Sequence, residues 1–236
     1  MSIPILILGN SGTGKTRSTK SFNEHELLIV NSTGKMLSYF DKHPDMLNVP
    51  LKAREVQEKT GGALPLKADV IRSYLNKYHD HKAVVIDDYG YAMFEIYDRY
   101  KLSEEERLNN RYEPFDIIVR KMSQQVDALM NDGDVDRIVY IVMHADKDSD
   151  GTIKPLIMGR FVNEKYVLEG MMTVTLYSEK LGERYVFHTN NGNPAKSPDG
   201  LFPEDMVDND LRAIDARIRE AYGYPALSST SAGDAK

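Results

Sequence analysis

The first sixteen residues constrain the fold of this chain more than any other stretch. An apolar run without charge, Ile3 to Leu8, is typical of a buried parallel strand. Eight residues with a fixed pattern follow it directly: Gly9, Asn10, Ser11, Gly12, Thr13, Gly14, Lys15 and Thr16. They match G-x-x-x-x-G-K-[ST] at every fixed position, and a strand in front of this pattern makes the match specific. We therefore expect a phosphate-binding loop between a strand and a helix.

Each residue type in this pattern has a chemical reason. Glycines let the backbone curl so that successive N–H groups point at phosphate oxygens. Lys15 can reach the β- and γ-phosphates, and the Thr16 hydroxyl can ligate Mg²⁺, which takes few protein ligands. A helix that begins near Gly14 and continues to Phe22 would add its positive dipole end. The sequence therefore predicts that this loop, with Arg17 after it, binds ATP and Mg²⁺.

A second strand pattern supplies the carboxylate that such a site needs. The run from Ala83 to Ile86 is apolar, and Asp87 and Asp88 follow it. A carboxylate at the carboxyl end of a parallel strand can hold Mg²⁺ directly or through water. Four apolar residues before an aspartate are a weak indication of a metal site by themselves. About seventy residues after a complete phosphate-binding loop, the same pattern is a good indication. We assign Asp87 to the metal, together with Thr16.

The composition limits what the chain can be. It has 236 residues, a formal net charge of −6 and no cysteine. The negative charge excludes a globally basic nucleic-acid binder, although a local basic groove stays open. Without cysteine there are no disulfides and no thiolate metal sites, and no stretch is long and apolar enough for a membrane span. We expect a soluble, cytoplasmic protein.

Later segments complete an α/β pattern. The apolar run Leu27 to Val30 predicts a short strand, and Ile138 to Met143 predicts another, with His144 at its end. We expect His144 to lie beside the nucleotide. Residues 171–177 and 184–188 alternate between apolar and polar on either side of a link that contains glycine. They predict an antiparallel hairpin appended to a parallel sheet.

The chain is predicted to form one domain over residues 1–224, a length that suits a single α/β domain. Its last helix could open at Pro203 and carry an apolar stripe of Leu211, Ile214 and Ile218. Residues 225–236 are rich in serine, alanine and glycine, which predicts a disordered tail.

The order of these features resembles the RecA-like P-loop ATPase core. It runs from the phosphate-binding loop through a short strand, the strand ending in Asp87-Asp88, the strand ending in His144 and a polar loop to the hairpin. In particular it is similar to the compact phage-encoded RecA-like ATPases grouped with the single-strand annealing proteins. The resemblance covers Ile3 to about Asn191 and continues to Tyr224. It implies a mostly parallel sheet with helices on both faces and an appended antiparallel hairpin.

The resemblance also implies roles for single residues. Lys15 and Thr16 match the phosphate lysine and the Mg²⁺ hydroxyl, and Asp87 matches the metal-associated aspartate. His144 stands where the family has a polar γ-phosphate sensor. A basic residue from the next subunit usually completes such a site, because the transition state needs a further cation. Arg160 is our candidate for that residue, with a DNA phosphate contact or a solvated loop residue as alternatives.

Two departures from the family pattern leave parts of the site open. Recombinases commonly place a catalytic glutamate just after the second strand, where this chain has Asn31 and Ser32. The water-activating role is therefore open, with Asp88 as the leading candidate. The segment from Asp146 to Lys165, where recombinases keep a DNA-binding loop, has four basic and four acidic residues. Since phosphate contacts dominate DNA affinity, this balance predicts weak, salt-sensitive binding unless subunits pool their charges.

These features favour an ATP-hydrolysing recombination or annealing protein that acts on single-stranded DNA as a homo-oligomeric ring or filament, with DNA-stimulated turnover. A single-stranded-DNA-binding protein is a further candidate partner. Two alternatives stay open. A P-loop kinase for a small molecule or nucleotide needs converging arginines, and only Arg99, Arg107 and Arg111 offer such a set. A nucleotide-dependent switch or assembly protein with slow hydrolysis agrees with the missing glutamate.

Overall fold

The computed structural model describes residues 2–39, 44–77, 80–100, 119–121, 123–124, 126–128, 136–157, 167–190 and 192–228. Nine strands in this part of the chain form one sheet. Their order is β3 (Asp45–Asn48), β2 (Leu27–Asn31), β4 (Ala83–Asp87), β5 (Ile138–Lys147), β1 (Ile3–Gly9), β7 (Val174–Leu181), β8 (Arg184–His188) and β9 (Met206–Asp208), with β6 (Ile153–Pro155) paired to β5. Neighbours from β3 to β7 are parallel, whereas β6, β8 and β9 pair antiparallel.

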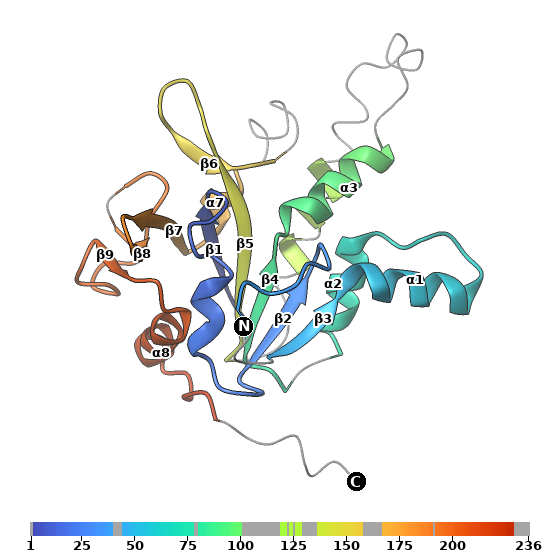
Figure 1. Cartoon of the computed structure of the whole chain (residues 1–236), viewed down its shortest axis with the longest axis horizontal. Coiled ribbons are helices and arrows are strands. Elements are labelled where there is room, and N and C mark those ends of the chain that lie inside the picture. Colours follow the sequence, from blue (N-terminus) through green and yellow to red (C-terminus); the bar gives the residue numbers. More distant parts are fainter. Residues whose placement is uncertain are drawn as a thin grey trace.

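The alternation of side chains along the buried strands divides the core into two layers. In β1, Leu6 and Leu8 belong to one buried cluster, and Ile5 and Ile7 belong to the other. Figure 1 shows α1, α2 and α3 on one side of the sheet and α8 on the other. The predicted fold class is therefore confirmed: a mostly parallel sheet, helices on both faces and an antiparallel hairpin. The helices whose bounds lie within the described residues are α1 (Val49–Thr60), α2 (Lys67–Leu75), α3 (Gly90–Tyr100), α7 (Leu168–Met171) and α8 (Leu211–Tyr222).

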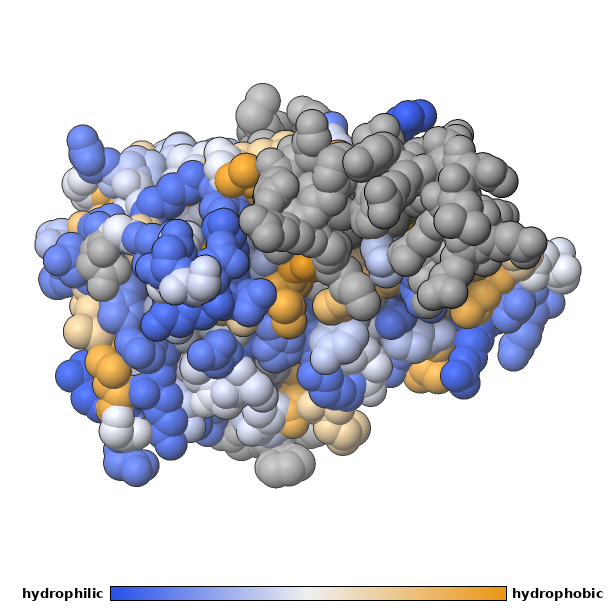
Figure 2. Space-filling model, turned by 90° about the horizontal axis from the view of Figure 1, so that it is seen from above, coloured by the Kyte–Doolittle hydropathy of each residue, from blue (hydrophilic) through white to orange (hydrophobic). Residues whose placement is uncertain are grey.

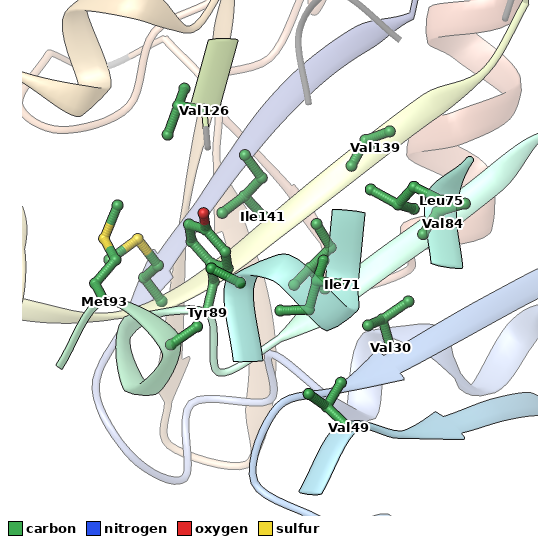
Figure 3. Close-up of a cluster of buried hydrophobic side chains, with 14 of the residues drawn as sticks. Val30, Val49, Ile71, Leu75, Val84, Tyr89, Met93, Val126, Val139 and Ile141 are labelled. Carbon is green, nitrogen blue, oxygen red and sulfur yellow. The ribbon is translucent and has the colours of Figure 1, made fainter. Parts of the chain in front are cut away.

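The first layer joins the central strands to the helices beside them. Figure 3 shows Val30, Val84 and Ile141 of the sheet facing helical residues such as Ile71 and Met93. All of these side chains are buried to within a few per cent of complete burial. Burying one such side chain contributes roughly 1.5–3 kcal/mol, so this layer is a main source of stability. It also keeps the strand ends fixed relative to one another.

The carboxyl ends of three central strands meet at one edge of the sheet. β5 lies between β1 and β4, and its residue His144 is in register with Gly9, the last residue of β1. Asp87 ends β4 and is in register with Asn31 at the end of β2. Beyond His144, β5 continues past the other strands and returns as β6 (Figure 1). The fold thus gathers the loop after β1, Asp87 and His144 at one edge.

The last helix begins later than the sequence suggested, and the prediction of an opening at Pro203 is wrong. Residues 206–208 form β9, and α8 begins only at Leu211. The Asp210 carboxylate caps the helix by accepting from the backbone N–H groups of Arg212 (3.0 Å) and Ala213 (3.1 Å). The predicted apolar stripe is buried: Leu211, Ile214 and Ile218.

In the described part of the chain, no helix combines the length and the apolar character needed to cross a membrane. Of the predicted disordered tail, residues 229–236 lie outside the described residues.

Candidate active site

The loop after β1 is backed by the antiparallel extension of the sheet. Gly14 has a φ of +95°, a backbone region that residues with a side chain rarely adopt. A Cβ atom at Gly14 would lie 2.7 Å from the Tyr185 ring, and one at Gly9 would lie 2.6 Å from the Ser178 carbonyl oxygen. The Ser178 hydroxyl also donates to the Thr13 carbonyl at 2.8 Å. Both glycines are therefore required by close contacts with β7 and β8.

Lys15 lies folded against the inside of this loop. Its ammonium donates to the carbonyl oxygens of Gly9 and Asn10, both at 2.7 Å, and the residue is only 7% exposed. Burial lowers the pKa of Lys15 to about 8, although the charges of Asp88 and Asp87 act in the opposite direction. A buried cation among curled backbone N–H groups is an arrangement that phosphate oxygens would neutralise.

The segment after the loop differs from the predicted helix over residues 16–22. It is η1 (Arg17–Ser21), a 3-10 helix of five residues. The hydroxyls of Ser18 and Thr19 donate to the carbonyls of Lys15 (2.6 Å) and Thr16 (2.8 Å), and such local bonds compete with regular helix geometry. A helix this short adds little dipole, so the loop N–H groups and Lys15 carry the anion site.

The structure brings Thr16 and Asp87 together beneath the loop. The Thr16 hydroxyl lies 3.1 Å and 3.3 Å from the two Asp87 carboxylate oxygens. Burial, and then the negative charge of Asp88, raises the pKa of Asp87. A bound cation would stabilise the charged form of this carboxylate. The Ser32 hydroxyl, buried after β2, has no hydrogen-bond partner among the described residues. These hard oxygens fit Mg²⁺, which keeps several waters and needs few protein ligands.

Asp88 stands next to Asp87 but contacts different partners. Its carboxylate lies 2.5 Å from the Lys35 ammonium and 3.4 Å from His144 Nε2. The side chain of Asp88 is 8% exposed, and its φ of +56° is uncommon for a residue other than glycine. Burial, and then the charge of Lys15, lowers the pKa of His144. The imidazole is therefore neutral near pH 7, since its ordinary pKa is about 6.5.

Lys15, Thr16, Asp88 and His144 line a common pocket of about 290 Å³, whereas Asp87 is not among its lining residues. Tyr185 also lines it, with the Arg17 guanidinium 4.9 Å from the ring centre. Figure 2 shows the molecule from above, where the described surface is mostly hydrophilic and apolar residues form small separate groups. The pocket residues are Ser11, Gly12, Gly14, Lys15, Thr16, Arg17, Lys35, Ser38, Asp88, His144 and Tyr185.

Three of these residues, Lys35, Ser38 and Tyr185, were not expected from the sequence. Lys35 belongs to a stretch without clear periodicity, and Tyr185 reaches the loop only through the pairing of β8 with β7. The sequence did contain one indication for Lys35: it follows shortly after the predicted strand Leu27 to Val30, whose end was expected near the phosphates. Arg160, the expected residue from a neighbouring subunit, lies outside the described residues.

Comparisons with known proteins add little to this picture. No protein-family model matches the chain, and no curated protein matches it. Among solved structures, a KaiC-like protein from the hyperthermophilic archaeon Pyrococcus horikoshii OT3 is similar at a TM-score of 0.33 and 14% identity, covering 87% of this chain and 89% of that one. A TM-score this low carries no weight by itself. The complete loop and the aspartate strand match the P-loop pattern in sequence, and the sheet brings their ends to one edge.

Proposed function

We propose that this protein is a Mg²⁺-dependent ATPase of the phage recombination or annealing type, acting on single-stranded DNA as an oligomer. The observation that carries the ATPase part is the Thr16–Asp87 contact directly beneath the loop that holds Lys15. Thr16 lines the pocket together with Lys15 and contacts Asp87, so a phosphate site and a metal site would adjoin, as phosphoryl transfer requires. The fit of the oxygen ligands to Mg²⁺ supports the same assignment.

The residues in and beside the pocket would have different roles in hydrolysis. Lys15 neutralises phosphate charge, and Thr16 and Asp87 would hold Mg²⁺, which when bound neutralises charge on the β- and γ-phosphates. Asp88 is the carboxylate available to orient a water and to accept its proton. The neutral His144, on the strand between the loop and Asp87, can hydrogen-bond to the γ-phosphate.

The DNA part of the proposal is supported by the position of the β5–β6 hairpin. β5 carries His144 and continues to Lys147, and the Leu156 N–H after β6 donates to the His144 carbonyl at 2.8 Å. A shift of His144 on γ-phosphate binding would therefore act directly on the hairpin, through β5 and this hydrogen bond. The hairpin has three acidic and two basic residues, partly paired as in the Lys154–Asp148 contact of 2.6 Å, so we expect weak, salt-sensitive DNA binding.

One observation favours a second function, a slow nucleotide-dependent switch with a protein partner. Asp88, the candidate for water activation, is engaged by Lys35 at 2.5 Å. A carboxylate oxygen that contacts a lysine is less accessible to a water, which would slow hydrolysis. Asn31, at the place of the missing glutamate, uses its side chain to hold its own loop.

ATP turnover with and without single-stranded DNA separates these functions. Our proposal predicts Mg²⁺-dependent release of phosphate that DNA stimulates and that Lys15→Ala abolishes, while the folded content of the variant is unchanged. Slow turnover without a response to DNA would favour the switch, and transfer of the phosphoryl group to a nucleotide or small molecule would favour a kinase. Equal turnover by wild type and Lys15→Ala would reject the site.

A further inference from the structure

The loop after β2 presents one lysine to the pocket. The Asn31 carboxamide oxygen accepts from the N–H groups of Thr33 (3.1 Å) and Gly34 (2.7 Å), and its amide donates to the Lys35 carbonyl (2.6 Å). Gly34 has a φ of +76°, which closes this turn. The backbone of Lys35 is therefore held at a defined point beside the end of β4.

The Lys35 side chain is largely exposed, whereas that of its partner Asp88 is buried. The side chain of Lys35 is 60% exposed, and that of Asp88 is 8% exposed on a backbone of unusual φ. The Lys35 ammonium also lies 5.8 Å from the centre of the Tyr91 ring. Both partners line the pocket that contains Lys15 and His144. An exposed cation thus contacts a buried carboxylate at the place where the terminal phosphate is expected.

We propose that Lys35 is a γ-phosphate-binding residue supplied by the same subunit, and that it leaves Asp88 when a nucleoside triphosphate binds. This inference rests on the proposed nucleotide site. A terminal phosphate offers more negative charge than one carboxylate, and charge-assisted bonds to it are strong. A diphosphate lacks that group, so Lys35 stays on Asp88. Lys35 thereby distinguishes triphosphate from diphosphate.

The exchange also connects binding to hydrolysis. While Lys35 is paired with Asp88, the carboxylate is neutralised and is not available to a water. When Lys35 turns to the γ-phosphate, Asp88 is released beside His144, 3.4 Å from its Nε2. The base is thus released only when the substrate is in place, and the loop cation adds to the charge of Lys15 at the phosphate end.

The test compares the affinities for ATPγS and ADP, with Mg²⁺, in four proteins: wild type, Lys35→Met, Asp88→Asn and the double variant. Lys35→Met should weaken ATPγS binding about ten- to one-hundredfold, the usual effect of losing a bond to a charged group, and leave ADP binding nearly unchanged. Lys82→Met is the matched control, because it removes a Lys–Asp pair, Lys82–Asp136 at 3.1 Å, outside the pocket.

The double variant separates contact with phosphate from mere neutralisation of Asp88. If Lys35 touches the γ-phosphate, Lys35→Met weakens ATPγS binding in the Asp88→Asn background as well. If the double variant binds ATPγS as tightly as Asp88→Asn alone, Lys35 acts only on Asp88 and the inference is wrong. Equal loss of ATPγS and ADP affinity in Lys35→Met would also overturn it. Wild type that binds neither nucleotide would instead reject the proposed function, and this inference with it.

Discussion

At the scale of single residues, two adjacent aspartates have different surroundings. Asp87 faces the Thr16 hydroxyl beneath the loop, whereas Asp88 faces Lys35 and His144 across the pocket. The φ of +56° at Asp88 turns its side chain away from the direction that strand geometry would give it. Unusual backbone conformations of this kind persist where the surroundings hold them, often at functional sites. The two carboxylates can therefore serve metal and water separately.

Asp88→Asn should keep nucleotide binding and lose hydrolysis. The amide preserves the shape of the side chain but cannot accept a proton, and a general base typically contributes a factor of about 10²–10⁴ to the rate. Single-turnover hydrolysis and ATPγS affinity measure the two effects. Asp87→Asn is the control, and it should lose Mg²⁺-dependent binding. Normal turnover in Asp88→Asn would move the base role to a neighbouring subunit or to Glu55, which is paired with Lys52 on α1.

The low pKa of Lys15 predicts a pH dependence of binding. In the free protein this pKa is about 8, because burial disfavours the charged form. Phosphate favours the charged form, so the pKa rises on binding and a proton is taken up above about pH 8. Affinity for ATP should therefore fall as the pH rises through this value, by up to about tenfold for each further pH unit. Calorimetry in buffers of different ionisation enthalpy measures the proton uptake, and no uptake at high pH would contradict the prediction.

At the scale of elements, an ion pair between the buried Glu26 and the partly exposed Arg212 joins α8 to the chain just before β2. The Glu26 carboxylate accepts from the Arg212 guanidinium at 2.7 Å and 2.9 Å, and its side chain is 1% exposed. Burial alone would raise the pKa of Glu26, but the hydrogen bonds from Arg212 and Asn23 and the Arg212 charge lower it to about 2. The pair therefore holds the helix that covers the second core layer.

Glu26→Gln should destabilise the protein by about 1–3 kcal/mol near pH 7, because the buried side chain loses its charge-assisted hydrogen bonds with Arg212. The folded pKa of Glu26 lies below the ordinary value of 4.5, so its contribution is present above that value and is lost as the pH falls towards about 2. Denaturant unfolding across this range should show a smaller loss of stability for Glu26→Gln than for wild type. Glu24→Gln, on an exposed neighbour, is the control and should match wild type.

The sequence was informative where one strand or one loop carries the signal. The loop after β1, the apolar runs of β4 and β5 and the β7–β8 hairpin were predicted because each is local. The 3-10 form of η1 was not, since it depends on hydroxyls bonding back to the chain. The positions of Lys35 and Tyr185 were also out of reach, because β2 and β8 meet the loop after β1 only through sheet pairing. Local sequence patterns do not specify which distant strands pair in the sheet, or in which register.

At the scale of the whole molecule, the proposal requires assembly around the pocket. Lys35 supplies a cation from the same subunit, and the resemblance to RecA-like cores implies another from the next subunit. Arg160 stays our prediction for that residue, from the sequence alone. Beside Lys35, Met36 follows in the chain and the centre of the Tyr91 ring lies 5.8 Å from the Lys35 ammonium, and these two apolar residues are 84% and 42% exposed.

Mixing variants tests whether Arg160 acts across subunits. Arg160→Ala and Lys15→Ala should each be inactive alone, and their mixture should regain part of the activity, because some interfaces then pair an intact Lys15 with an intact Arg160. ATP turnover at fixed total protein measures the recovery, with light scattering as the measure of assembly. Normal hydrolysis by Arg160→Ala, or a variant that stays monomeric while wild type assembles, would reject the role.

The central claim is that the pocket beneath the loop binds a nucleoside triphosphate with Mg²⁺, and equilibrium binding tests it most directly. Titration of ATPγS into the protein by calorimetry, with and without Mg²⁺, should show one site per chain for wild type. Lys15→Ala should weaken this binding at least about one-hundredfold, since a buried cation that contacts phosphate is lost. Both proteins should unfold at similar denaturant concentrations. Binding of equal strength in wild type and Lys15→Ala, or binding that Mg²⁺ does not affect, would contradict the claim.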